Sequence, residues 1–323
     1  MRKSNIVSEQ RLEVLSIGET LIDLISDTEQ GSLGEARSFR MYPGGQATNV
    51  ALNLARLGAS AILVARVGDD PFGSYLRQHL EIAGVGTAYL HTTPQKPTTL
   101  VVVTRQSATP DFAVYRGADA EMVPGDMPSS LLSRTSLVHT SAFALSREPS
   151  CSTVLDFVKR AHETGCLISF DPNYHPRLWE MPDDPASIFA RICPYVNLTK
   201  PSLDDCIRLF GADQTPETYA THFLAWGARQ VVLTMGADGV LLANAEGTSY
   251  YSTHLVEVVD VTGAGDSFWA GLLVATLDGY TMPEAIRVAQ AVAAIKLQQI
   301  GPLSQVIDRA ALYAHIGLQK EES

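Results

Sequence analysis

Cysteine, aromatic residues and long apolar runs are scarce in this chain of 323 residues. No stretch approaches the roughly 20 apolar residues of a membrane helix, and the N-terminus lacks the apolar core of a signal peptide. The four cysteines form no Cys-x-x-Cys pair, which argues against a zinc site or a disulfide framework and fits a reducing compartment. We therefore expect a soluble cytoplasmic protein.

An excess of positive charge is also lacking. The chain has 24 Lys and Arg residues against 35 Asp and Glu, a formal net charge of −11, which argues against a nucleic-acid backbone as a partner. Apolar residues make up 46% of the chain, enough for a substantial core. There is no internal repeat or low-complexity linker, and the length allows one large α/β domain or two modest ones.

Apolar runs typical of strands alternate with segments of helical spacing. This alternation predicts a mostly parallel central sheet covered by helices on both faces. The expected strands lie at 12–18, 61–68, 136–143, 166–173, 195–202 and 230–239, and the expected helices at 49–59, 71–84, 152–165 and 203–211.

Two stretches, at about 20–43 and 95–116, break the alternation because they indicate strands without intervening helices. We predict that these two excursions form a small sheet of their own. Such an appendage beside a binding site is a candidate lid. The alternative is that they add strands to the main sheet.

The stretch "DVTGAGDSFWAG" (260–271) joins an expected strand at 256–260 to an expected helix at 267–279. Gly263, Ala264 and Gly265 thus lie at a helix N-terminus, where unpaired backbone N–H groups and the helix dipole favour an anion such as phosphate. Asp266 would face the same site and could take a proton from a hydroxyl that attacks phosphorus. The alternative is a tight turn with Asp266 as the N-cap. No lysine follows the glycines, so this is not a Walker A loop.

A second glycine loop, "YPGGQATNVALNLARLG" (42–58), carries Gly44 and Gly45 before a helix and Asn49 in its first turn. The amide of Asn49 offers both donors and acceptors, which suits sugar hydroxyls. Asp23 in "ETLIDLI" could hold two hydroxyls. Taken singly, the glycines and Asn49 also fit a loop with a helix cap, and Asp23 also fits a solvated charge on an edge strand.

Together the segments at 44–73 and 260–273 resemble the two signatures of the PfkB, or ribokinase-like, carbohydrate kinases, and the resemblance extends from "SIGETLID" (16–23) to "AAIKLQQIG" (293–301). It implies one ribokinase-like α/β domain over 12–318 with a small β-sheet lid. It also implies transfer of the γ-phosphoryl group of ATP to a primary hydroxyl of a small sugar.

The resemblance also implies roles for single residues. Asp266 becomes the general base and the amides of Gly263, Ala264 and Gly265 an anion hole, meaning a set of N–H groups around the transferring phosphoryl group. The positions that match the sugar site are Asp23, Gly44, Gly45 and Asn49. Those that match the nucleotide site are Lys200, Ser202, Thr234, Gly236, Gly239 and Gln290.

Metal ions and partners follow from the same resemblance. In "KPSLDD" (200–205) the family's Asn-x-x-Glu motif for magnesium and phosphates reads Ser202-x-x-Asp205, so Asp205 would act on Mg²⁺ through water. The alternative is a serine N-cap followed by acidic residues in the first helical turn, which accounts for the same sequence. The family often uses K⁺ near the anion hole, and dimers through the lid are common in it, so a homodimer is an expectation here.

Three segments, at 115–120, 139–146 and 171–179, resemble the fructokinase and 2-keto-3-deoxygluconate kinase branch. That branch usually has arginine where this chain has His175, and arginine suits an acidic sugar. We therefore expect a neutral ketohexose, with Arg116, Asn173 and His175 near it and 2-keto-3-deoxygluconate as the alternative. Arg177 and Arg116 could compensate for the missing arginine. A nucleoside kinase and a non-catalytic sugar-binding protein rank lower, and the chain lacks the Gly-x-Gly-x-x-Gly of a Rossmann dehydrogenase.

Overall fold

The computed structural model describes residues 12–105, 111–253, 256–300 and 302–318. Its main sheet has nine strands in the order β13-β12-β11-β10-β9-β8-β1-β4-β5. All neighbours pair in parallel except β11 with β12 and β12 with β13. The strands are β1 (Leu12–Ile17), β4 (Ala61–Gly68), β5 (Gly86–Thr93), β8 (Thr135–Ser141), β9 (Leu167–Asp171), β10 (Leu198–Thr199), β11 (Gln230–Thr234), β12 (Val240–Asn244) and β13 (Gly247–Tyr251).

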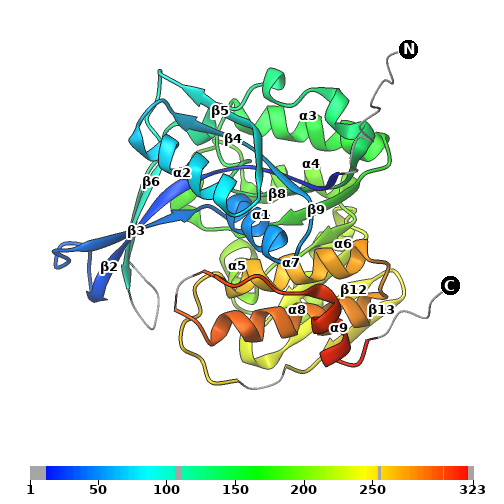
Figure 1. The fold of residues 1–323 in the computed structure, drawn as a ribbon. Helices are drawn as coiled ribbons and strands as arrows, with labels where there is room; N and C mark the ends of the chain where they lie inside the picture. The colour runs from blue at the N-terminus through cyan, green and yellow to red at the C-terminus, as the bar shows by residue number, and fades with distance from the viewer. Residues whose placement is uncertain (1–11, 106–110, 254–255, 301, 319–323) are drawn as a thin grey trace, which may run out of the picture.

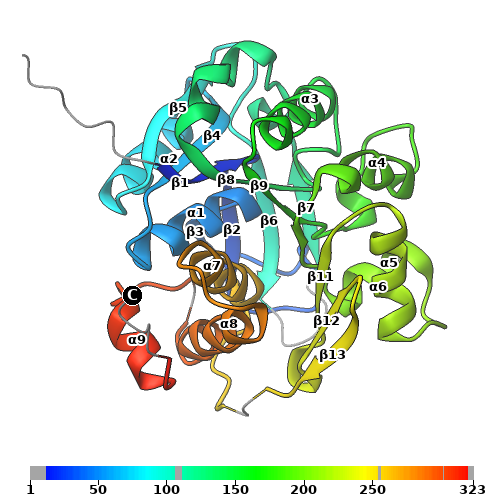
Figure 2. The ribbon, with the colours of Figure 1, turned by 90° about the vertical axis from the view of Figure 1, so that its right-hand side faces the viewer.

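Helices cover both faces of this sheet, as the alternating pattern predicts (Figure 2). One face carries α3 (Ser150–Glu163), α4 (Pro185–Ile192), α5 (Leu203–Phe210) and α6 (Pro216–Ala225). The other carries α1 (Gln46–Arg56), α2 (Pro71–Ile82), α7 (Ala264–Leu277), α8 (Met282–Leu297) and α9 (Arg309–His315).

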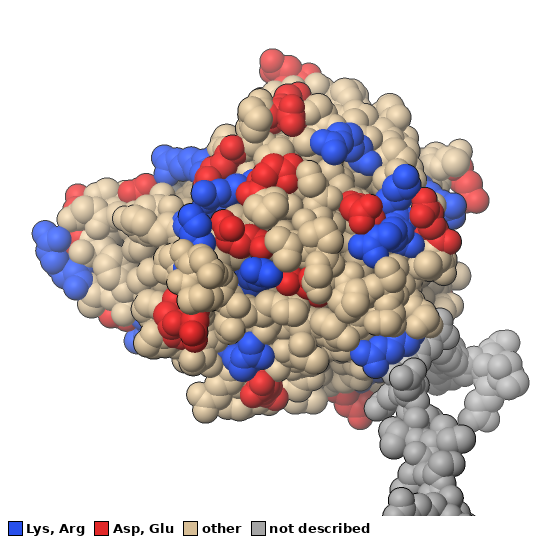
Figure 3. Space-filling model, turned by 90° about the horizontal axis from the view of Figure 1, so that it is seen from above, with Lys and Arg blue, Asp and Glu red and all other residues tan. Residues whose placement is uncertain are grey.

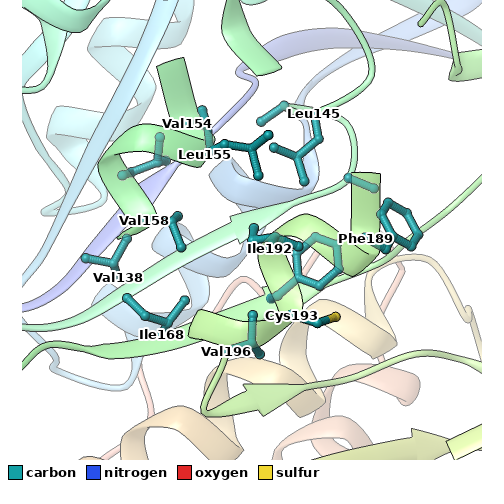
Figure 4. Packing of buried hydrophobic residues seen from close by; sticks show 14 of the residues in the cluster. Val138, Leu145, Val154, Leu155, Val158, Ile168, Phe189, Ile192, Cys193 and Val196 are labelled. Carbon is teal, nitrogen blue, oxygen red and sulfur yellow. The ribbon is translucent and has the colours of Figure 1, made fainter. Parts of the chain in front are cut away.

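The core is split by the sheet because successive strand side chains point to opposite faces. In β1, Val14 packs with the α1–α7–α8 side, whereas Leu15 and Ile17 pack with the α3–α4 side. Figure 4 shows the second layer, where Val158 of α3 and Ile192 of α4 lie over the strands. A sheet buried on both faces can expose functional groups only at its strand ends.

A second sheet of four strands, in the order β3-β2-β6-β7, forms from the two excursions. Figure 1 shows it projecting from the body of the molecule. The prediction of a separate small sheet is thus confirmed, and the alternative, extra strands on the main sheet, is wrong. Below, this sheet is called the lid. Its strands are β2 (Leu21–Glu29), β3 (Phe39–Gly44), β6 (Leu100–Arg105) and β7 (Phe112–Tyr115).

The structure differs from the expected elements around the second glycine motif. Residues 256–260 were expected to form a strand, but they form irregular chain, and α7 already begins at Ala264. Two of the valines there are about half exposed: Val258 is 54% and Val259 50% exposed. Their β-branched pattern suggests a strand, yet no neighbouring strand pairs with them among the described residues. Gly265 and Asp266 consequently lie inside the first helical turn.

In the described part of the chain, no helix is long and apolar enough to cross a membrane. On the face that Figure 3 shows, basic and acidic side chains are intermingled, without a broad patch of one sign.

Candidate active site

Polar residues follow several neighbouring strands of the main sheet. Glu19 comes after β1, Asp171 ends β9, Lys200 follows β10 and Thr234 ends β11. Because the carboxyl ends of parallel strands meet at one edge, these residues share the edge where ligands bind in open α/β sheets. The N-terminus of α7 reaches the same edge, since Lys200 lies beside Gly265: a methyl group added at Gly265 would be 3.8 Å from the Lys200 Nζ.

The N-terminus of α7 begins with a left-handed residue, Gly263, at φ 73°. This conformation suits glycine and turns the chain into the helix. The first-turn N–H groups of a helix lack intrahelical partners, as the anion-hole prediction requires for Gly265. The N–H of Asp266, which that prediction did not include, belongs to the same first turn. The N–H of Ala264 differs from that prediction, because it already donates to the carbonyl oxygen of Val261 at 3.1 Å.

Asp266 faces Asn49, whose Nδ2 donates to the Asp266 carboxylate at 2.9 Å. Burial and the negative charge of Asp171 raise the pKa of Asp266 to about 7, against the opposing effects of Asn49 and Lys200. Burial and the charge of Asp266 raise the pKa of Asp23 to about 7 as well. A carboxylate that titrates near neutrality is suited to general-base catalysis. The alternative of Asp266 as the N-cap is wrong, because Gly263 is the N-cap of α7 and no side chain caps this helix.

The glycine loop before α1 holds Asp23 in place. A methyl group at Gly44 would overlap with Oδ2 of Asp23, and one at Gly45 (φ 102°) would lie 2.6 Å from the carbonyl oxygen of Glu19. Both glycines therefore permit close approach of the loop to β2 and to the end of β1. The sequence prediction brought these residues together with Asp23 and Asn49, and the structure does so too.

We expect Gly44→Ala to lower kcat/KM for the alcohol substrate by about 10²-fold, since a displacement near 1 Å costs that much. The reason is that the added methyl group pushes the Asp23 carboxylate aside. Steady-state kinetics and a melting curve measure the effect, with nucleotide affinity expected to stay unchanged. Gly125→Ala is the matched control, because a methyl group there meets nothing within 4 Å. Equal kinetics for the two variants would contradict a role for Asp23.

A first pocket, here called the lid pocket, has a volume of about 190 Å³ and lies between the lid and the loop before α7. Asp23, Arg40 and Arg105 come from the lid, Asn49 from α1, and Gly263 from the N-cap of α7. It is rich in hydrogen-bonding side chains, which suits a small polyhydroxylated molecule. The other lining residues are Ile25, Ser26, Asp27, Tyr42, Pro43, Asp260, Thr262, Ile300 and Pro302.

A second pocket, here called the α7–α8 pocket, is larger, at about 450 Å³, and more apolar. Its polar members include three predicted nucleotide residues at the β11–β12 turn and Gln290, whose Nε2 donates to the carbonyl oxygen of Ser252 at 2.9 Å. The N-terminus of α7 separates the two pockets, because Gly263 lines one and Ala264 and Gly265 line the other. The predicted residues are Thr234, Gly236, Gly239 and Gln290; apolar walls come from Val240, Val256, Val258, Val261, Phe268, Ala293, Ala294 and Leu297.

Lys200 is held by a buried polar network that sequence reasoning missed. Its Nζ lies 3.0 Å from Oδ2 of Asp171, and Gln46 joins Asp171 (3.0 Å) to His139 (2.9 Å). Burial lowers the pKa of Lys200, but Asp171, Asp205 and Asp266 outweigh it, so the pKa is raised and the ammonium stays charged. Asp171 was visible as an acid directly after the apolar run "LISF", the one signal that could have found it.

Ser202 and Asp205 form a capping box at the start of α5. The hydroxyl and N–H of Ser202 donate to the Asp205 carboxylate at 2.6 and 2.9 Å, and the Asp205 N–H returns to the Ser202 hydroxyl at 3.1 Å. The serine-cap alternative thus accounts for this geometry. Within the described ranges, no three His, Cys, Asp or Glu residues gather as a metal site. An indirect, water-mediated role of Asp205 stays a prediction.

Besides Gly44 and Gly45, which act on the loop, three more predicted substrate residues lie outside the lid pocket. The guanidinium of Arg116 is buried against Asp119 (Nε to Oδ2, 2.9 Å) and over the ring of Phe143 at 4.1 Å. His175 packs edge-on against Phe112 of the lid, with ring centroids 4.7 Å apart, and shares a very small cavity with Asn173. The structure therefore does not bring Arg116, Asn173 and His175 together with Asp23.

A base titrating near neutrality sits at a helix N-terminus that separates a polar pocket from an apolar one. This is the geometry of a phosphotransferase acting on a nucleotide and an alcohol. Residues 11–308 match the model of the pfkB family carbohydrate kinases, and the chain belongs to this family.

Relatives support the same assignment. The chain is 35% identical to the ATP-dependent 6-phosphofructokinase of Thermoanaerobacterium thermosaccharolyticum, over 98% of this chain and 97% of that one. It is 33% identical to a fructokinase of Klebsiella pneumoniae, over 83% and 85%. Its fold is similar to a fructokinase of Vibrio cholerae solved with fructose, ADP and potassium (TM-score 0.81, 29% identity, 96% and 99% covered). The protein is an ATP-dependent carbohydrate kinase.

Proposed function

We propose that this kinase transfers the γ-phosphoryl group of ATP to a primary hydroxyl of a ketohexose, with fructose as the first choice. The observation that carries the proposal is that Asp23 and Asn49 line the lid pocket and that Asn49 donates a 2.9 Å hydrogen bond to Asp266, whose charge also acts on Asp23. Such a group can grip neighbouring hydroxyls and leave a carboxylate beside the one that reacts.

Each part of the site has a task in this reaction. Asp266 takes the proton as the sugar oxygen bonds to the γ-phosphorus and the bond from that phosphorus to ADP breaks. The N–H groups of Gly265 and Asp266 and the ammonium of Lys200 stabilise the charge on the phosphoryl oxygens. The apolar walls of the α7–α8 pocket receive the base of the nucleotide. Mg²⁺ would come with the phosphates, near Asp205, and neutralise their charge.

The charges of the lid pocket favour a neutral sugar over a sugar acid. Asp23, Asp27 and Asp260 line it beside Arg40 and Arg105, and Arg40 lies 3.5 Å from Asp27. Two other basic residues that were expected to hold a carboxylate are paired elsewhere. Arg116 binds Asp119, and Arg177 lies 3.4 Å from Asp111. A carboxylate next to Asp23 and Asp266 would meet like charge.

A substrate panel tests this proposal. ADP release would be followed with fructose, tagatose, ribose, adenosine, 2-keto-3-deoxygluconate and no sugar, with mass spectrometry of the product. We expect fructose to give the highest kcat/KM and one phosphoryl group at a primary hydroxyl. Preference for 2-keto-3-deoxygluconate or adenosine, or no sugar-dependent ADP release at all, would overturn the proposal.

Fructose 6-phosphate is a second candidate, favoured by Arg40 and Arg105 in the lid part of the pocket. Arg40 lies 3.5 Å from Asp27 and is 69% exposed, so a phosphate could replace that carboxylate. Arginine forks match phosphate geometry. If this candidate is correct, Arg105→Gln lowers kcat/KM for fructose 6-phosphate and leaves that for fructose unchanged. Equal losses for both sugars would speak against a phosphate contact.

A homodimer through the lid is the remaining part of the proposal. Tyr115 of β7 is 62% exposed and Phe39 of β3 is 37% exposed, which gives the lid apolar surface for a second copy. Sedimentation of the protein with and without Tyr115→Glu tests it, and a monomer in both cases would end it.

A further inference from the structure

Lys296, near the end of α8, has a fully buried side chain. Lysine is almost never fully buried unless it is paired. Its Nζ donates to the carbonyl oxygen of Asp260 at 2.6 Å and to that of Gln299 at 3.3 Å, and Oδ2 of Asp260 lies 3.7 Å away. The buried ammonium therefore sits among two backbone carbonyl oxygens and one carboxylate oxygen.

These oxygens belong to the segment that leads into the anion-binding turn. The N–H groups of Val259 and Asp260 donate to the carbonyl oxygen of Leu297, next to Lys296. The N–H of Thr262 donates to Oδ1 of Asp260 at 2.9 Å. Asp260 thus links the ammonium on one side to the turn at Thr262 and Gly263 on the other. Removing the ammonium would take one of its ties away from this loop.

Carbonyl and carboxylate oxygens are also the ligands that replace the water shell of K⁺ in proteins. The similar fructokinase of Vibrio cholerae was solved with potassium bound. In this chain two carbonyl oxygens beside the anion-binding turn already accept hydrogen bonds from the ammonium, and a carboxylate oxygen lies 3.7 Å from it. A potassium ion at the same oxygens would meet that positive charge at close range. The residues present here therefore do not fit K⁺.

We propose that the ammonium of Lys296 is a tethered monovalent cation that takes the place of potassium, so that this kinase works without it. Lys296 is a positioning residue: it touches neither sugar nor phosphate, and acts by holding residues 260–263 where α7 begins. Through Asp260 its positive charge is linked to the turn that receives the phosphoryl group in our proposal. This inference rests on family membership and on these contacts, whichever sugar is the substrate.

The wild-type protein gives the first test. Calorimetric ADP binding and the melting temperature would be measured in potassium chloride and in tetramethylammonium chloride at equal ionic strength. We expect the same ADP affinity and melting temperature in both salts. A potassium-specific gain in either quantity would overturn the proposal. These readouts need no sugar, so they are independent of the proposed function.

Variants at Lys296 give the second test. Lys296→Met keeps the volume and removes the charge, and we expect ADP affinity to fall about tenfold, an ordinary coupling between neighbouring sites. Lys296→Ala leaves room for an ion, and we expect potassium, but not tetramethylammonium, to restore its ADP affinity. Lys159→Met, at an exposed lysine of α3, is the control.

The remaining outcomes decide against the proposal. Wild-type affinity in Lys296→Met would show that the ammonium is dispensable. A folded Lys296→Ala that ignores potassium would show that Lys296 is only a structural tie. Where neither variant folds, the salt comparison on the wild-type protein still decides.

Discussion

Asp266→Asn is expected to lower kcat by about 10²–10⁴-fold, the usual worth of general-base assistance, while ADP affinity stays close to that of the wild type. The amide keeps the shape and the hydrogen bond to Asn49 (2.9 Å) possible, but it cannot accept a proton from the sugar hydroxyl. Steady-state kinetics with the preferred sugar and calorimetric ADP binding measure the two effects separately.

The matched control for this variant is Asp213→Asn, since Asp213 is an exposed carboxylate. Its kinetics should equal those of the wild type. Near-normal turnover of a folded Asp266→Asn variant would remove Asp266 as the base. A parallel loss of ADP affinity would instead mean that the substitution disturbs the N-terminus of α7.

Lys200→Met is expected to lower kcat by about 10²–10³-fold, the scale of losing one group that stabilises transition-state charge. The ammonium lies beside Gly265, where the phosphoryl group passes in our proposal. This variant also leaves Asp171 without its partner at 3.0 Å, and breaking a buried ion pair costs about 3–5 kcal/mol. Kinetics alone would mix the two effects.

The double variant Lys200→Met with Asp171→Asn separates them. An asparagine can still accept the hydrogen bond from Gln46 (3.0 Å), and no unpaired charge remains. We expect its melting temperature to return most of the way to the wild-type value while kcat stays low. Recovery of kcat together with stability would show that Lys200 serves the fold and not the reaction.

The sequence predicts best what is encoded locally. The turn at Gly263 and the helix after it could be predicted because a glycine that suits a left-handed cap and an apolar helix follow each other in one short segment. The lid could be predicted because two stretches of the sequence indicate strands with no helix between them. The glycine loop before α1 could also be predicted, because its glycines and the helix lie next to each other in the sequence. The close approach of Gly44 to Asp23 appears only in the structure.

Contacts between distant segments are what the sequence leaves out. Asp171 and Lys200 lie at the ends of two different strands, and their side chains are 3.0 Å apart. Lys296 donates a hydrogen bond to Asp260, which lies far from it in the sequence. A buried charge looks like a surface charge in the sequence, because its partner is set by the packing of the sheet edge. The same reason explains Arg116, which lies near the lid in sequence but is held by Asp119.

The pH dependence of kcat/KM tests the central claim most directly, namely that a raised-pKa carboxylate at the N-terminus of α7 deprotonates the sugar. The unprotonated form is the base, so the rate must fall as pH drops through the pKa. Asp266 and Asp23 both have pKa values raised to about 7. Because the two carboxyl groups interact, the fall of the rate at low pH reports the titration of the pair and not of one residue. We predict an acid limb with its midpoint near pH 7. A profile that stays level down to about pH 4, where an ordinary aspartic acid titrates, would contradict the account.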